Sequence, residues 1–223
     1  MTILPITTLS FPEIHLAMRD AHKLRGYFGK LFRDHSPLLH NHFEDGRSRY
    51  TYPLVQYKIL HNVPILVGLG EGADLLAELF LKTKELNIEG QIYPIFAKEI
   101  KHQRIPIGFT NVLENYYFST LWLALNQVNY QIYQQLAEEK KINFLEKILT
   151  GNILSFFKTF KHFFDSSEII NLEFDPDKER TTKVKNQNML AFSGRFSANV
   201  CLPDNIGLGK AVARGFGTIQ KIC

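Results

Sequence analysis

Apolar residues recur along the N-terminal third of the chain with two different periods. Residues 2–9 are rich in Ile, Leu and Thr, which is typical of a β-strand. Over residues 14–31 the apolar positions return every three or four residues, as on the buried face of a helix. Ser10 and Glu13 have the spacing of a capping box, so we expect this helix to run from Ser10 to about Phe32.

The elements predicted after this helix complete a known order. They are a polar loop over 33–49, strands over 50–60 and 63–69 joined by a turn at His61-Asn62, a helix over 73–84 and a strand over 88–100. The order strand, helix, strand, strand, helix, strand is that of a ferredoxin-like domain.

The second half of the chain has a less regular pattern. We predict an aromatic, β-prone segment over 115–125, followed by a helix over 126–164 that is broken near Thr150-Gly151-Asn152. Strands are predicted over 169–174, 179–186 and 189–200, with a turn at Asp175-Pro176-Asp177 between the first two. A short strand over 216–222 ends the chain. This favours a second unit of the same type, with a boundary between residues 100 and 101. The predicted fold is therefore α+β, with two tandem ferredoxin-like (RRM-like) domains over 1–100 and 101–223 and a C-terminal glycine-rich loop.

Composition removes several classes of protein. Apolar residues make up 45% and charged residues 22% of the 223 residues, an ordinary globular mixture rather than a disordered one. No apolar run is long enough to span a bilayer, and the first ten residues lack the basic segment of a signal peptide. Cys201 and Cys223 cannot form a disulfide framework or a four-thiolate zinc site. We therefore expect a cytoplasmic protein without a membrane partner.

The net charge of +4 hides an uneven distribution of charge. Residues 178–221 carry a net +6 and residues 19–58 a net +4, so the rest of the chain is acidic. Two basic blocks indicate a surface for a polyanion if the fold brings them together. The alternative is that they form two separate solvated faces.

A glycine-rich loop near the C-terminus is the most informative segment. Residues 207–217 contain four glycines together with Lys210 and Arg214. Backbone N–H groups of such a loop can bind phosphate oxygens, and the two cations can add charge-assisted hydrogen bonds. The spacing fits neither a P-loop nor a dinucleotide-binding fingerprint. A tight structural turn is the alternative interpretation.

This loop closely resembles one family of proteins. The run Leu202-Pro203-x-x-Ile206-Gly207-Leu208-Gly209-Lys210, followed by Arg214-Gly215-Phe216-Gly217-Thr218-Ile219, is similar to the C-terminal loop of the CRISPR repeat-processing endoribonucleases, the Cas-six family of the RAMP superfamily. Three further segments agree in order, namely Leu24-Arg25-Gly26-Tyr27, Leu39-His40-Asn41-His42 and Tyr52-Pro53-Leu54-x-Gln56-Tyr57-Lys58. The resemblance covers most of 1–100 and 190–222, and the family has two ferredoxin-like domains.

The resemblance implies a metal-independent endoribonuclease that cuts CRISPR precursor RNA within its repeats. In that reaction the 2′-hydroxyl attacks the neighbouring phosphorus and leaves a 2′,3′-cyclic phosphate and a 5′-hydroxyl. Histidine suits both proton transfers because its pKa lies near neutrality. His40 and His42 lie in the loop where many such enzymes keep their histidine, and Tyr50 could orient the 2′-oxygen. Tyr27 and Lys58 are second candidates for catalysis.

The predicted RNA-binding residues are cations and glycines: Arg47, Arg49, Gly207, Gly209, Lys210, Arg214, Gly215 and Gly217. We predict no cofactor and no metal. The His40-x-His42 pair is a candidate metal site but lacks a third ligand at suitable spacing. Glu173, Asp175 and Asp177 could bind Mg²⁺, although Pro176 among them favours a solvated turn.

Two functions stay open at this point. The first is the endoribonuclease, with CRISPR repeat RNA as its partner. The second is a non-catalytic RNA-binding subunit of a guide-RNA effector complex in the same superfamily. Other effector subunits and a second copy of the chain are further candidate partners. The histidines favour the enzyme, because a protein that only binds RNA needs cations but no proton shuttle. A nucleotide-binding protein is a third interpretation, disfavoured by the loop's spacing.

Overall fold

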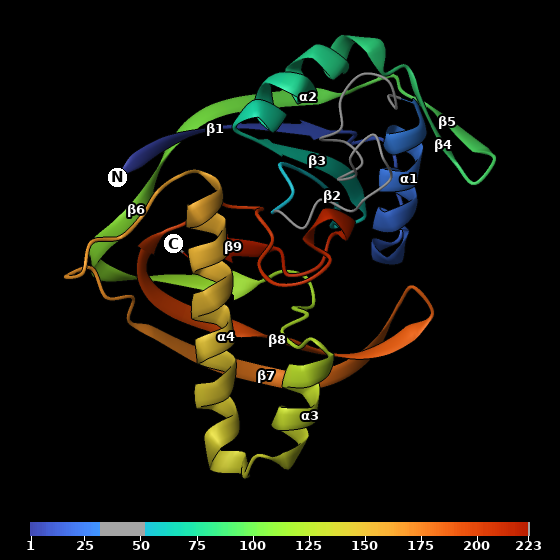
Figure 1. Cartoon of the computed structure of the whole chain (residues 1–223). Coiled ribbons are helices and arrows are strands. Elements are labelled where there is room, and N and C mark those ends of the chain that lie inside the picture. The colour runs from blue at the N-terminus through green and yellow to red at the C-terminus, as the bar shows by residue number, and fades with distance from the viewer. Residues whose placement is uncertain (32–51, 223) are drawn as a thin grey trace, which may run out of the picture. The chain divides into compact units, whose positions relative to one another are not determined.

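The computed structural model describes residues 1–31 and 52–222. The chain divides into two compact units, which we describe separately (Figure 1). The N-terminal unit consists of Ile3–Ile105 together with Val212–Gly215. The C-terminal unit consists of Met1–Thr2, Pro106–Ala211 and Phe216–Cys223. A short piece of the glycine-rich loop thus belongs to the N-terminal unit, although the rest of the loop belongs to the other.

The N-terminal unit has the order and topology of a ferredoxin-like domain. Its elements are β1 (Thr2–Ser10), η1 (Met18–Asp20), α1 (Ala21–Leu31), β2 (Val55–Leu60), β3 (Val63–Leu69), α2 (Glu71–Lys82), β4 (Glu85–Ile88), β5 (Gln91–Pro94) and the first part of β6 (Glu99–Phe118). The strands are ordered β2-β3-β1-β6, and β4 and β5 form a separate hairpin. The ferredoxin-like prediction is confirmed for this unit.

Helices α1 and α2 pack on the same face of this sheet. Leu24 and Phe28 of α1 and Leu76 of α2 belong to one buried cluster with Tyr57 of β2 and Leu66 of β3. Tyr57 and Leu66 are opposite each other in the antiparallel β2–β3 register, so their side chains share that face. The periodic apolar positions of the sequence therefore identify the face that is buried.

The helix predicted from Ser10 is wrong in its starting point. β1 continues to Ser10, whose hydroxyl donates a hydrogen bond to Glu99 at 3.3 Å instead of capping a helix. The N–H of Phe11 then donates to the carbonyl oxygen of Pro64 at 3.2 Å, which holds the following segment against the β2–β3 hairpin. The helix begins only at Ala21, because tertiary hydrogen bonds outcompete the local capping signal.

The strand predicted over 88–100 is also wrong. The segment contains the turn of the β4–β5 hairpin, where Glu89 and Gly90 have φ of 53° and 92°, and β6 begins at Glu99. The hairpin between β2 and β3 was predicted correctly, and His61 and Asn62 have φ of 50° and 67° there.

The C-terminal unit is a second ferredoxin-like domain in which a loop replaces one helix. After the second part of β6 come α3 (Gln127–Gln135), α4 (Glu138–Thr159), β7 (Leu172–Val184), β8 (Gln187–Cys201) and β9 (Ile219–Lys221). β6 pairs with β8 on one side and β9 on the other, and β7 pairs with β8. Between β8 and β9, where the second helix of such a domain would lie, the chain forms the glycine-rich loop with η3 (Val212–Arg214).

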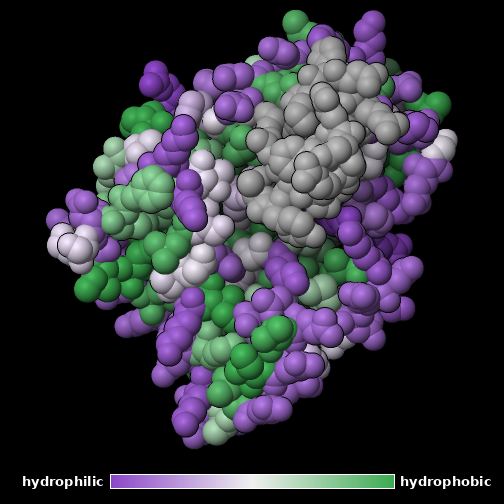
Figure 2. Space-filling view, viewed as in Figure 1, coloured by the Kyte–Doolittle hydropathy of each residue, from purple (hydrophilic) through white to green (hydrophobic). Residues whose placement is uncertain are grey.

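Aromatic rings fill the core of this unit. Trp122 is fully buried and stacks on Phe118 with a centroid distance of 5.2 Å, and Phe174 packs edge-on to Trp122 at 5.3 Å. The indole N–H donates to Asn152 of α4 at 3.1 Å, which satisfies the buried donor. In contrast, Val128 and Ile132 of α3 are exposed. Figure 2 shows an apolar patch in the lower part of the molecule, in the region where Figure 1 draws α3.

The break predicted near Thr150 and Gly151 is wrong, because both residues lie inside α4. The chain breaks instead at Leu136 and Ala137, which have extended backbone. Glu138 begins the first turn of α4, where a negative charge is favourable near the helix N-terminus. None of the described helices is both long enough and apolar enough to cross a membrane.

The turn predicted at Asp175-Pro176-Asp177 is wrong as well. Strand β7 runs through these residues, with an irregularity in its pairing between Pro176 and Lys178. Proline has no N–H to give to the ladder, so a bulge forms here rather than a turn. Gly194 on the facing strand permits the bulge, since a Cβ there would lie 2.2 Å from the carbonyl oxygen of Asp175.

Candidate functional site

Five predicted site residues lie outside the described residues. The sequence between α1 and β2 contains the two histidines, the tyrosine and the two arginines proposed to perform proton transfer and to hold phosphate: His40, His42, Arg47, Arg49 and Tyr50. Their roles stay predictions. The remaining predicted residues lie on α1, on β2 and in the glycine-rich loop.

Lys58 is a fully buried cation on β2. Removal from water penalises its charged form and lowers the pKa of the ammonium from 10.5 to about 7. Side chains alternate along a strand, so Lys58 points away from the face on which Tyr57 packs against Phe28 of α1. A lysine with this pKa can transfer protons near neutrality, but contact with RNA would require its burial to change.

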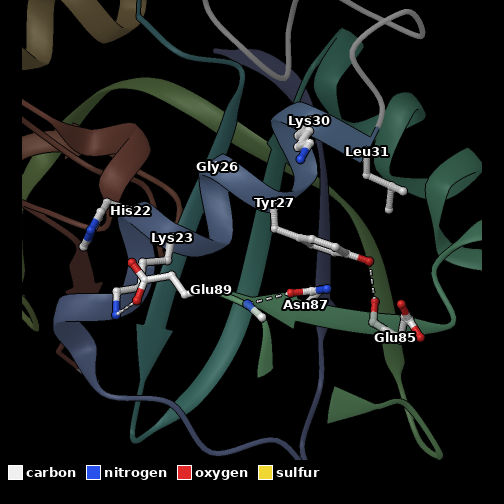
Figure 3. A pocket seen from close by; sticks show the side chains of 10 residues that line it. His22, Lys23, Gly26, Tyr27, Lys30, Leu31, Glu85, Asn87 and Glu89 are labelled. Carbon is white, nitrogen blue, oxygen red and sulfur yellow. Dashed lines mark hydrogen bonds and ion pairs between the residues drawn. The ribbon is translucent and has the colours of Figure 1, made fainter. Parts of the chain in front are cut away.

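Tyr27 lies on α1, at the helix-covered side of the sheet. Its hydroxyl donates a hydrogen bond to the backbone carbonyl oxygen of Glu85 at 2.8 Å, and burial raises the pKa of the phenol above its usual 10 (Figure 3). The phenol thereby connects α1 to the β4–β5 hairpin. Since Tyr27 and Lys58 lie on opposite sides of the sheet, the fold does not bring these two second candidates together.

Backbone hydrogen bonds hold the glycine-rich loop within the C-terminal unit. The N–H of Leu208 donates to Gly217 at 2.8 Å, and the N–H groups of Gly217 and Lys210 donate to Leu121 and Leu123. These three N–H groups are therefore used inside the protein rather than directed at a ligand. The Lys210 side chain is exposed.

Close packing explains why glycine is needed at two positions of this loop. Gly209 and Gly217 have φ of 90° and 62°. A Cβ at Gly209 would lie 2.6 Å from the indole nitrogen of Trp122, and one at Gly217 would lie 1.9 Å from the carbonyl oxygen of Leu208. The structural interpretation of the loop thus accounts for both glycines without any ligand.

The piece of the loop in the N-terminal unit approaches β2 and α1. Gly215 has a φ of 86°, and a Cβ there would lie 3.2 Å from the carbonyl oxygen of Tyr57 and 3.1 Å from the Ala21 Cβ. η3 therefore packs against both elements. Among the predicted residues, this contact brings Arg214 and Gly215 next to the backbone of Lys58, whose Cα would be 3.6 Å from that Cβ.

A second arginine, which the sequence analysis did not select, lies beside Arg214. Both Arg25 and Arg214 are partly buried, and burial lowers the pKa of each guanidinium. The positive charge of Arg214 lowers the pKa of Arg25 further, which means that the two charges are close enough to repel each other. We call Arg25 and Arg214 the arginine pair. The run Leu24-Arg25-Gly26-Tyr27 was a usable signal for Arg25, because it belongs to the family resemblance.

The arginine pair is suited to hold a phosphate. Two guanidinium groups offer planar forks of N–H donors that match phosphate oxygens, and a bound anion would relieve their mutual repulsion. The two residues are far apart in sequence, one on α1 and one on η3, and they belong to the two basic blocks of the sequence, residues 19–58 and 178–221. The fold thus brings one part of each block together.

Comparison with known proteins identifies the family. The model of the Cas6b N-terminal domain matches residues 2–106, and the model of the Cas6b C-terminal domain matches residues 108–222. The chain belongs to the Cas6b family. The resemblance to the Cas-six family and the two ferredoxin-like domains expected from it are therefore confirmed.

Solved structures of Cas6b agree with this fold over nearly the whole chain. One structure, described as Cas6b, is 36% identical with a TM-score of 0.93, and covers 99% of this chain and 100% of its own. Another, described as CRISPR RNA processing endoribonuclease Cas6b, is 33% identical with a TM-score of 0.80 and the same coverage. The uncharacterized protein MJ0978 of Methanocaldococcus jannaschii is 32% identical over 148 residues, which are 66% of this chain and 99% of that protein.

Proposed function

We propose that this chain is an endoribonuclease that cleaves CRISPR precursor RNA within its repeats. The observation that carries the proposal is its agreement, over 99% of the chain, with a Cas6b protein described as a CRISPR RNA processing endoribonuclease. The arginine pair supports it, because an RNA-cleaving site needs positive charge beside the reacting phosphate.

The proposed reaction uses the RNA's own 2′-hydroxyl and no metal ion. A general base removes the 2′-proton, and the 2′-oxygen forms a bond to the adjacent phosphorus. The bond from phosphorus to the 5′-oxygen then breaks, and a general acid protonates that oxygen. The products are a 2′,3′-cyclic phosphate and a 5′-hydroxyl, so atoms and charges balance without a further reactant.

His40 and His42 are the proposed base and acid, and Tyr50 is proposed to orient the 2′-oxygen. In this scheme Arg47 and Arg49 neutralise the charge that develops on the phosphorus oxygens. Lys58 stays a second candidate for proton transfer because of its pKa of about 7.

RNA binding is proposed to involve the glycine-rich loop as well. The exposed Lys210 and the arginine pair supply charge, and Gly209, Gly215 and Gly217 hold the loop in its shape; Gly207 is proposed to contribute as part of the same loop. CRISPR repeat RNA is thus the proposed partner. Association with other effector subunits or with a second copy of the chain stays a proposal.

A non-catalytic RNA-binding subunit is the second candidate function. The arginine pair favours it equally well, since guanidinium groups bind phosphate without any proton transfer. Cleavage of RNA, rather than binding, therefore separates the two functions.

The deciding experiment incubates the protein with its cognate repeat RNA in EDTA. We expect a single cut that leaves a 2′,3′-cyclic phosphate. The same RNA with a deoxyribose before the cut should bind but remain intact, because the nucleophile is missing. A strict requirement for Mg²⁺ would contradict the proposed mechanism, and binding without cleavage of the all-ribose RNA would favour the non-catalytic subunit.

A further inference from the structure

None of the described residues explains the glycine in the middle of α1. Gly26 lies within the helix at an exposed position, and a Cβ there would meet no atom of residues 1–31 and 52–222 within 4 Å. Glycine weakens a helix relative to alanine because it is harder to order. Gly209, Gly215 and Gly217 each have a clash or a positive φ that excludes a side chain, but Gly26 has neither.

Gly26 lines an open groove whose walls are α1 and the β4–β5 hairpin (Figure 3). The two walls are attached to each other at both ends. The Tyr27 hydroxyl bonds the carbonyl oxygen of Glu85 at 2.8 Å, and Lys23 forms an ion pair with Glu89 at 2.7 Å. The groove is therefore already formed without a ligand, which reduces the entropy that binding would cost.

Two polar side chains flank Gly26 on the helix. His22, Gly26 and Lys30 are spaced by four residues, so they lie on one face of α1, and all three are exposed. The imidazole Nδ1 of His22 is 2.7 Å from the carbonyl oxygen of Arg19, so Nδ1 carries a hydrogen and the ring is held in place. The row extends for about 12 Å along the helix axis.

The charges on the two walls differ. Residues 18–31, which form η1 and α1, contain four Lys or Arg and one carboxylate, Asp20. Lys23 bonds both Asp20 and Glu89, which leaves Lys30 to provide charge at the row around Gly26. The facing hairpin carries Glu85, whose carboxylate accepts hydrogen bonds, and Asn87, whose Oδ1 already accepts from the Gly90 N–H at 3.0 Å and whose amide NH₂ can donate.

We propose that this groove binds one strand of the RNA substrate through its sugar–phosphate backbone, which passes directly over Gly26. The proposal rests on the proposed function, since it assigns a further contact surface for the same RNA. Phosphates lie on the α1 side at Lys30, hydroxyl or amino groups of the RNA donate to the His22 Nε2, and riboses or bases face the hairpin. Gly26 is glycine because a methyl group would occupy the space that the RNA backbone fills.

The test uses two glycines that have the same helical environment. Gly151 of α4 is also exposed, and a Cβ there would also meet nothing within 4 Å, but Gly151 does not line the groove. Both Gly26→Ala and Gly151→Ala should raise the melting temperature, because alanine is the better helix former. Only Gly26→Ala should weaken the affinity for repeat RNA, by about fivefold or more, as expected of a steric overlap.

Binding is measured with repeat RNA that has a deoxyribose before the cut, so that turnover does not interfere. Lys30→Gln should lower the slope of log affinity against log salt by about 0.7, the value for one phosphate of a single strand. The exposed Lys147 of α4 provides the matched control, and Lys147→Gln should leave the slope unchanged.

The outcomes separate this proposal from the proposed function. If Gly26→Ala stabilises the protein but binds RNA like the wild type, the groove does not contact RNA, whatever the cleavage result. If Gly26→Ala lowers the melting temperature, the glycine has a structural role and the proposal is overturned. A wild-type protein that binds but does not cleave overturns the endonuclease alone, and one that does not bind repeat RNA overturns both.

Discussion

The two ferredoxin-like units differ in the segment that comes after their third strand. In the N-terminal unit β3 leads directly into α2, whereas in the C-terminal unit β8 leads into the glycine-rich loop. The helix satisfies its own backbone, and the loop instead bonds to residues 121–123 and to itself. Only the loop also supplies Val212–Gly215 to the other unit, where Arg214 lies beside Arg25.

In both units a glycine permits close backbone packing near the connection that follows the third strand. A Cβ at Gly68 of β3 would lie 2.1 Å from the carbonyl oxygen of Gly72 in α2, and one at Gly217 would lie 1.9 Å from that of Leu208. A glycine-rich sequence after a strand therefore indicates close backbone packing, and it does not by itself indicate a ligand site. The C-terminal loop also carries the cations Lys210 and Arg214, whereas the β3–α2 connection has none.

The largest expected effect is on the rate of RNA cleavage and concerns the two histidines of the N-terminal half that are proposed to transfer protons. His40→Ala and His42→Ala should each lower the single-turnover cleavage rate by about 10²–10⁴, the usual loss for a positioned proton-transfer group. Affinity for repeat RNA should change little, because a neutral imidazole releases no counterion on binding. Quench-flow cleavage and filter binding measure the two quantities.

The double variant tests whether the two histidines act as one unit. We expect His40→Ala with His42→Ala to be little slower than the slower single variant, because groups that act together are not additive. Wild-type cleavage in both single variants would refute the assignment and leave Tyr27, Tyr50 and Lys58 as candidates.

The next effect compares close packing in the two units. Gly68→Ala should lower the free energy of unfolding by about 1–3 kcal/mol through steric overlap with α2. Gly217→Ala adds a strained positive φ to a similar overlap, so its cost should be larger, about 2–5 kcal/mol. Urea denaturation gives both values. Equal costs would mean that the backbone strain at Gly217 relaxes in the variant.

The third effect is a dependence of the free energy of unfolding on pH that arises from Lys58. Because the pKa of the folded state is about 7 and that of the unfolded state is near 10.5, the unfolded chain binds the extra proton between these values. Wild-type stability should therefore rise with pH over this interval, relative to Lys58→Met, with a slope of at most about 1.4 kcal/mol per pH unit. Denaturation at pH 7.5, 8.5 and 9.5 measures this difference. Parallel curves for the two proteins would show that Lys58 is charged in the folded state.

The smallest effect is on the salt dependence of RNA binding, and it tests which cations of the loop contact phosphates. Lys210→Gln and Arg214→Gln should each lower the salt slope of RNA binding by about 0.7 if each contacts one phosphate of a single strand. Arg25→Gln should behave like Arg214→Gln, and the two changes combined should be non-additive, because one phosphate is held by both. Strict additivity would indicate that Arg25 and Arg214 bind separate phosphates.

Local patterns predicted an element well where a single period continued without interruption. The β2–β3 hairpin and its turn at His61-Asn62 were predicted correctly, because alternation and turn residues agree there. The helix start at Ser10 was wrong, since hydrogen bonds from Phe11 to a distant hairpin outweigh a capping box. The supposed turn at Pro176 is a bulge, because Gly194 on the facing strand makes room for it.

For the candidate site, the sequence alone was enough to select Arg214 and the glycine-rich loop, and the family resemblance to select His40, His42 and Tyr50. Arg25 was missed although its run Leu24-Arg25-Gly26-Tyr27 belongs to the family resemblance, because its role depends on Arg214, which lies 189 positions later in the chain. The burial that lowers the pKa of Lys58 is equally invisible in a strand pattern.

The amino-acid sequence by itself determined the first five elements of the N-terminal unit, the family and the residue types available for chemistry, because these depend on local periodicity and on short motifs. Only the tertiary structure decided which of those residues meet. The arginine pair, the buried Lys58 and the open groove at Gly26 each arise where elements far apart in sequence pack together. Charge repulsion, desolvation and free space depend on distance in three dimensions, and no spacing along the chain encodes them.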